Sequence, residues 1–175
     1  MSLATPVLAL PQPAESVFLL VEKHLEENGF RIIDRDLKRP WGGFFVIEPA
    51  QAEFFAQQYF PGVDFESLRI TDNLSPKILM VAPGQRLSWQ YHFRRAEIWR
   101  LVAGTAELVT SADDTERNHQ VLAMGELIRL KQGERHRLIG TKEGWGMVAE
   151  IWQHTVPDHP SDESDIVRLQ DDYRK

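Results

Sequence analysis

Short apolar runs, each ending at a turn-forming residue, follow one another through the second half of the chain. They are rich in β-branched and aromatic residues and are separated by Pro-Gly, Gly-Thr and Gly-Trp-Gly sequences. Many short strands with regularly spaced turns are typical of a sandwich or a small barrel. We therefore predict an all-β domain with strands at residues 77–82, 86–93, 97–101, 106–110, 119–123, 127–130, 136–139 and 146–153.

Helices are predicted only before this region. Residues 14–28 place Val17, Leu20, Val21, His24 and Leu25 on one face at helical spacing, and Gly29 follows as a stop. Residues 49–59 predict a second helix and residues 64–68 a further helical turn, with a short strand at 30–33. We divide the chain into an N-terminal arm and helix (1–37), packed on the barrel, and the barrel domain (38–175), whose charged tail at 158–175 should pack on the barrel.

Composition narrows the function classes. The 175 residues fit one domain, and the absence of cysteine excludes disulfides, thiolate metal sites and cysteine nucleophiles. A net charge of -6 gives no attraction to nucleic acid or to an anionic membrane. The chain has no apolar run of the roughly 20 residues that a membrane span needs, and its start lacks the basic residues of a signal peptide. We expect a cytoplasmic protein without nucleic-acid or membrane partners.

One motif combines glycines with polar side chains at fixed spacing. Gly84 is followed after five residues by Gln90, then after one residue by His92, after four by Glu97 and after six by Gly104. Residues two apart on a strand point to the same face, so Gln90 and His92 can both point into the barrel. Glu97 would reach the same space from the next strand.

A second motif lies about thirty residues further on. Gly125 is followed after five residues by Lys131, then after one residue by Gly133 and after two more by His136. Gly133 allows a turn that directs His136 towards the first three side chains. Amide oxygen, carboxylate and two imidazoles suit a divalent metal ion such as Zn, Fe(II), Mn, Co or Ni.

Together the motifs resemble the two-part signature of the cupins, with Gln90, Lys131 and Gly140 in place of the usual His, Pro and Asn. The resemblance implies a jelly-roll barrel, a double-stranded β-helix, that holds one metal ion with Gln90, His92, Glu97 and His136. Cupins also often pair through edge strands, which implies a homodimer.

The Gln-x-His pair with the later Glu and His resembles the zinc-ligand pattern of type II phosphomannose isomerases and their small stand-alone relatives, so zinc is the favoured ion. In that family the first motif usually reads Gln-x-His-x-His-Arg-x-Glu-His-Trp, and here Arg94 and Ile98 stand in place of two histidines. The resemblance runs from about residue 39 to the C-terminus and includes Arg39-Pro40-Trp41-Gly42-Gly43, Arg95-Ala96-Glu97-Ile98-Trp99, Gly133-Glu134-Arg135-His136-Arg137-Leu138, Ala149-Glu150-Ile151-Trp152-Gln153 and Asp165-Ile166-Val167-Arg168.

The resemblance implies a metal-dependent interconversion of an aldose phosphate and a ketose phosphate, such as mannose 6-phosphate and fructose 6-phosphate, through an enediol. Arg137 is a candidate catalytic contact because it follows His136, although neighbours on a strand face opposite ways and an ion pair is the alternative. Glu150 is a candidate base, with a buried hydrogen-bond acceptor as its alternative. Candidate phosphate ligands, each also readable as a surface charge, are Lys77, Arg86, Arg95 and Lys131.

Two other functions remain open at this point. The changes at Arg94 and Ile98 favour a non-catalytic cupin that binds a sugar or sugar phosphate and retains the metal site. An Fe(II) oxygenase is disfavoured, because Gln90 replaces a histidine of its usual ligand set.

Overall fold

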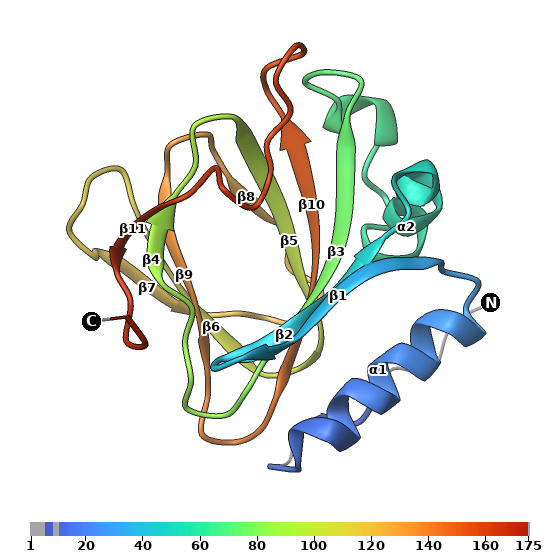
Figure 1. Cartoon of the computed structure of the whole chain (residues 1–175), viewed down its shortest axis with the longest axis vertical. Helices are drawn as coiled ribbons and strands as arrows, with labels where there is room; N and C mark the ends of the chain where they lie inside the picture. The colour runs from blue at the N-terminus through green and yellow to red at the C-terminus, as the bar shows by residue number, and fades with distance from the viewer. Residues whose placement is uncertain (1–5, 9–10, 175) are drawn as a thin grey trace.

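Two antiparallel sheets face each other and form a barrel in the computed structural model of the chain, which describes residues 6–8 and 11–174 (Figure 1). The larger sheet has the strand order β1 (Ile32–Arg39), β2 (Gly42–Ile47), β3 (Leu74–Val81), β10 (Gly146–His154), β5 (Arg95–Gly104) and β8 (Ile128–Leu130). The smaller sheet has the order β11 (Val167–Gln170), β4 (Trp89–Tyr91), β9 (Arg135–Gly140), β6 (Ala106–Ser111) and β7 (Asn118–Val121). The predicted all-β barrel is confirmed.

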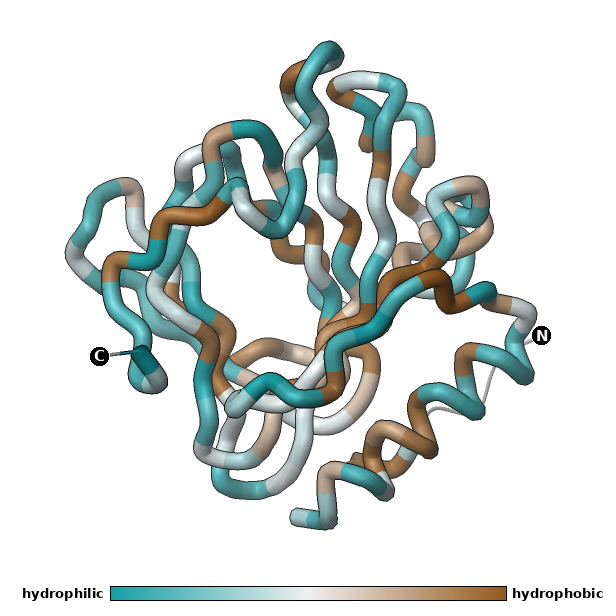
Figure 2. The backbone as a smooth tube through the Cα atoms, viewed as in Figure 1, coloured by the Kyte–Doolittle hydropathy of each residue, from teal (hydrophilic) through white to brown (hydrophobic). Residues whose placement is uncertain are grey.

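The larger sheet is buried on both faces, and this gives the molecule two apolar cores. Along β3, Leu79 and Val81 point into the barrel, whereas Ile78 and Met80 point outward. The inner core also includes Leu108 of the smaller sheet. The outer core lies between the larger sheet and the helices, which Figure 2 shows as hydrophobic stretches where α1 and the sheet approach each other.

The predicted helices form. The first is α1 (Ala14–Glu27), and the second starts as a 3-10 turn, η1 (Pro49–Gln51), and continues as α2 (Ala52–Tyr59); the predicted turn at 64–68 is η2 (Phe65–Leu68). One detail of α1 is wrong, because Leu20 is 42% exposed and Phe18 is buried in its place. Among the described residues no helix is long and apolar enough to cross a membrane.

Two strands of the larger sheet differ from the expectation. The strand predicted at 30–33 is the start of the longer β1, so the predicted domain boundary at residue 37 falls inside a strand of the larger sheet. Acidic and basic residues on the exposed face of β1 hide its apolar pattern. Strand β2 was not predicted, and it pairs with both β1 and β3.

Both ends of the chain pack on the barrel where they are described. The N-terminal arm, predicted at 1–13, lies partly outside the described residues, but Leu8 is buried and its carbonyl accepts a 2.9 Å hydrogen bond from the backbone of Trp145. At the other end the tail forms β11, which pairs with β4. The expectation that the tail packs on the barrel is confirmed.

Candidate metal centre and adjoining cavity

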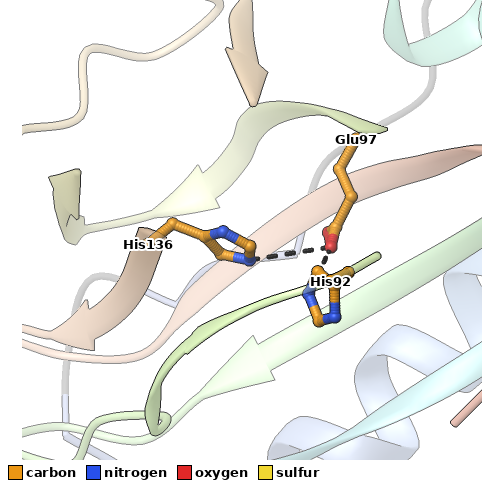
Figure 3. A group of neighbouring side chains, drawn as sticks. All are labelled: His92, Glu97 and His136. Carbon is orange, nitrogen blue, oxygen red and sulfur yellow. Dashed lines mark ion pairs between the residues drawn. The ribbon is translucent and has the colours of Figure 1, made fainter. Parts of the chain in front are cut away.

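Three predicted ligands meet inside the barrel (Figure 3). His92 directly follows β4, Glu97 lies on β5 and His136 on β9, and all three are buried. The His92 Nε2 atom lies 3.0 Å and the His136 Nε2 atom 3.6 Å from Glu97 Oε1. One ligand atom of each side chain therefore lies within 4.8 Å of the others, so these residues could hold one metal ion.

The Nδ1 atom of each imidazole lies within hydrogen-bond distance of a backbone carbonyl oxygen. His92 Nδ1 lies 2.7 Å from the Asp165 carbonyl oxygen, and His136 Nδ1 lies 3.0 Å from that of Glu134. Donation from Nδ1 leaves the lone pair on Nε2, the atom that faces Glu97, and this arrangement is usual for metal-binding histidines.

The His136 Nε2 atom is the observation that fits a metal ion best. It is buried and has no hydrogen-bond partner among the described residues. Burial lowers the pKa of His136 to about 4, partly offset by Glu97, so the imidazole is neutral at neutral pH. A buried acceptor without a partner costs about 1–3 kcal/mol, and a bound cation would remove this cost. The donor set therefore fits the metal that the resemblance implies.

Gln90 can complete the set. It lies on β4 directly opposite His136 of β9, and it is 8% exposed. Its Oε1 atom accepts a 2.8 Å hydrogen bond from Ser88 Oγ. An amide oxygen has two lone pairs, so this hydrogen bond leaves one for a metal ion.

Motif glycines fix how these strands approach. Gly133 has a φ of 81°, and its N–H donates a 3.0 Å hydrogen bond to the His92 carbonyl, which joins the second motif to the first. Gly104 has a φ of 74°, and a Cβ there would lie 1.9 Å from the Trp145 carbonyl oxygen. Glycine is therefore needed at these two positions for the backbone conformation, as well as being part of the family motif.

A second buried carboxylate, Glu150, lies beside Glu97. The Trp99 indole N–H is 3.1 Å from Glu97 Oε2 and 2.7 Å from Glu150 Oε2, and the Trp152 indole donates to Glu150 Oε1 at 2.8 Å. Burial and the charge of Glu97 raise the pKa of Glu150 well above its usual range. Burial alone would raise the pKa of Glu97 as well, but Arg95, Glu150 and His92 together hold it well below its usual range.

Two of the four predicted phosphate ligands lie at this site. Arg95 Nε is 3.3 Å from Glu97 Oε1, and its guanidinium stacks 3.6 Å from the Trp152 ring centre. Lys77 pairs with Glu163 between the rings of Phe44 and Trp152. Both cations are nearly buried, so protein groups already hold them.

The other predicted cations lie elsewhere. Arg86 pairs with Asp172, and Lys131 is exposed; neither is among the described residues that line the cavity. Arg137 is fully buried, but its guanidinium donates to the carbonyls of Leu87 and Gln170, at 2.8 and 3.1 Å, and not to the ligand cluster. Strand alternation thus places Arg137 on the face of β9 opposite His136.

The cluster adjoins a cavity of about 250 Å³. Gln90, Glu97 and Glu150 belong to its inner wall, together with Lys77 and Arg95. Much of the rest of the wall comes from the β1–β2 hairpin and from the tail, and sequence reasoning did not assign these parts to the site. The alternation of apolar and polar residues at 167–170 was the available signal for the tail strand.

The two positions that depart from the family motif lie outside the cavity lining. Ile98 is fully buried in the outer core, on the face of β5 opposite Glu97. Arg94 lies 3.4 Å from Asp162 and 3.9 Å from Asp165, on the outside of the tail. Neither departure therefore changes a described group of the cavity wall.

Comparison with known proteins gives one family. The family model described as mannose-6-phosphate isomerase C-terminal matches residues 49–171. A mannose-1-phosphate guanylyltransferase of Salmonella montevideo is 30% identical over 91% of this chain and 28% of its own length. The xanthan biosynthesis protein XanB of Xanthomonas campestris is 35% identical over 47% of this chain and 18% of its own. The chain thus spans less than a third of these relatives.

The structural comparison agrees with the barrel. The 7S globulin of Momordica charantia superposes with a TM-score of 0.53 at 16% identity, over 81% of this chain and 35% of that protein. At this identity the likeness shows the fold alone, and the fold is that of the cupins.

Proposed function

The chain belongs to the mannose-6-phosphate isomerase C-terminal family, a cupin family, and we propose from this premise that it is a metal-dependent sugar-phosphate isomerase. The reaction would interconvert mannose 6-phosphate and fructose 6-phosphate or a related pair. The Salmonella relative carries the name of a guanylyltransferase, but the family whose model matches here is named for the isomerase. We propose zinc as the metal, because two imidazoles and a carboxylate are ligands that it accepts readily.

The observation that carries the proposal is the cavity. Its wall includes two of the metal-ligand candidates and a second carboxylate. Gln90 and Glu97 line it together with Glu150, within a space closed by aromatic rings such as Trp99 and Trp152. A bound metal would supply a positive charge that polarises the substrate oxygens. The protein's part is to exclude water, to orient the sugar and to move protons.

The proton chemistry needs one further group. In the aldose-to-ketose direction the C2–H proton leaves and a proton is added at C1, while the C2 hydroxyl proton is transferred to the C1 oxygen; atoms and electrons balance without another reactant. We propose Glu150 as the acid–base group, because its carboxyl group lies in the cavity wall beside Glu97 and both of its oxygens are oriented by indole N–H groups.

A coupled assay on mannose 6-phosphate, with added zinc, manganese or cobalt, tests the proposal. Glu150→Gln keeps the shape of the side chain and should lower kcat by about 10²–10⁴-fold, the usual contribution of a general acid or base. Glu107→Gln on β6, whose carboxylate pairs with His119 on the outside, is the matched control and should leave kcat unchanged. Absence of metal-dependent turnover across a panel of hexose and heptose phosphates would contradict the proposal.

Binding without turnover is the outcome expected for the non-catalytic alternative. That alternative was favoured by Arg94 and Ile98, and both lie outside the cavity lining. The geometry therefore removes the observation that favoured the binding alternative.

A further inference from the structure

The mouth of the cavity carries three arginines from distant parts of the chain. Arg39 ends β1, Arg168 lies on β11 and Arg174 follows β11, and all three line the cavity. Their side chains are 32%, 27% and 61% exposed, whereas those of Lys77 and Arg95 are 7% and 6% exposed. The three arginines are therefore open to a solute that enters the cavity.

These arginines are only partly neutralised. Asp171 forms ion pairs with two of them, since its Oδ2 atom lies 3.3 Å from Arg174 Nε and 4.0 Å from Arg168 Nε. Arg39 Nε lies 2.9 Å from Asp36 Oδ2, but the pair is poorly aligned, and the buried Nε–H has no hydrogen-bond acceptor among the described residues. Donors without good acceptors thus remain at the mouth.

Their mutual repulsion supports the same conclusion. Burial lowers the pKa of Arg168, and the charges of Arg174 and Arg39 lower it further, against the opposing effect of Asp171. Guanidinium groups this close destabilise one another unless an anion lies between them.

We propose that Arg39, Arg168 and Arg174 form a subsite for the phosphoryl group of a sugar phosphomonoester. The guanidinium fork matches phosphate oxygens, and charge-assisted hydrogen bonds of this kind are strong. With the phosphate on these arginines, the rest of the sugar would lie in the same cavity, whose wall also includes Gln90 and Glu97. The identity of the sugar rests on the proposed function, but the phosphate subsite does not.

Isothermal titration of the protein as purified tests this subsite, with mannose 6-phosphate, mannose 1-phosphate and unphosphorylated mannose as ligands. Arg168→Gln, Arg39→Gln and Arg174→Gln should each weaken binding of a phosphomonoester about tenfold, as expected for loss of a charged hydrogen-bond donor. Affinity for mannose should not change. The control is Arg117→Gln, because Arg117 is 57% exposed, pairs with Asp113 and lies outside the described cavity lining.

The outcomes separate the subsite from the reaction. If the three variants bind mannose 6-phosphate as tightly as the wild type does, or if the wild type binds neither ester more tightly than mannose, the subsite is overturned, even where turnover shows that the isomerase proposal stands. Arginine-dependent binding without turnover supports the subsite and contradicts the isomerase. The two esters show whether the mouth prefers a phosphate at C6 or at C1, and unchanged thermal melting excludes misfolding of the variants.

Discussion

Replacement of His136 by alanine should separate metal binding from folding. The substitution removes a buried imidazole, and truncation of a buried side chain of this size costs about 2–4 kcal/mol. It also removes the buried Nε2 atom that has no hydrogen-bond partner among the described residues, which offsets about 1–3 kcal/mol. The metal-free variant should therefore be only about 1 kcal/mol less stable than the metal-free wild type, or about 2–4 °C lower in Tm for a chain of this length.

The response to zinc should differ much more. A ligand that binds only the folded state stabilises it by about 2.7 kcal/mol at a free concentration of 100 Kd. That corresponds to a rise in Tm of roughly 5–10 °C for the wild type. His136→Ala lacks one of the imidazoles that face Glu97, so at the same zinc concentration its Tm should hardly rise.

Differential scanning fluorimetry after dialysis against a chelator, with and without added zinc, measures both quantities. The matched control is His119→Ala, because His119 is exposed on β7 and pairs with Glu107 and not with a residue of the cluster; its zinc response should equal that of the wild type. An equal zinc-induced rise in His136→Ala and wild type, or equal metal content after purification, would refute the assignment of His136 as a ligand.

Further predictions concern the surrounding structure. Asp165→Ala keeps the carbonyl that contacts His92 Nδ1 but removes the carboxylate that anchors this segment to the backbone N–H groups at residues 93 and 94. Loss of that anchor should lower zinc affinity about 10–100-fold in a chelator competition, the size of effect known for groups that orient metal ligands. Gly104→Ala should lower the free energy of unfolding in urea by at least about 2 kcal/mol more than Gly84→Ala. Both glycines have a positive φ, but an added Cβ would meet a backbone oxygen at 1.9 Å at Gly104 and nothing within 4 Å at Gly84; equal losses would contradict this reading. Arg86 depresses the pKa of Asp172, so this pair adds stability above the unfolded pKa and loses it as the pH falls through the folded pKa. Asp172→Asn should accordingly cost less than about 1 kcal/mol at neutral pH, and a cost that persists in acid would argue against the ion pair.

The ligand cluster could be predicted from sequence because its residues lie in two motifs of fixed spacing. Alternation along a strand orients Gln90 and His92 alike, and Gly133 brings the second motif against the His92 carbonyl. The same alternation places Ile98, next to Glu97, in the outer core, so this departure from the family motif does not alter the ligand cluster.

The cavity mouth could not be predicted in the same way, because it depends on pairings between distant segments. Arg39 is brought there by the β1–β2 hairpin, whose polar outer face hides its strand pattern, and Arg168 by the pairing of β11 with β4 across more than seventy residues of chain. A short edge strand such as β11 is specified mainly by its partner and by packing, and only weakly by its own composition.

The C-terminal segment joins the metal centre to the cavity mouth through Asp165. The Asp165 carbonyl holds His92 Nδ1, its carboxylate accepts from the backbone at residues 93 and 94 and from Ser161, and Arg168 follows three residues later in the cavity wall. A metal ion that fixes His92 would therefore also fix the start of β11, and so the position of Arg168. By the same linkage, a phosphate held by Arg168 should raise metal affinity by the factor with which metal raises phosphate affinity. Titration of zinc with and without mannose 6-phosphate measures this coupling, and Asp165→Ala should abolish it; coupling of equal size in that variant would show that the two sites communicate by another route.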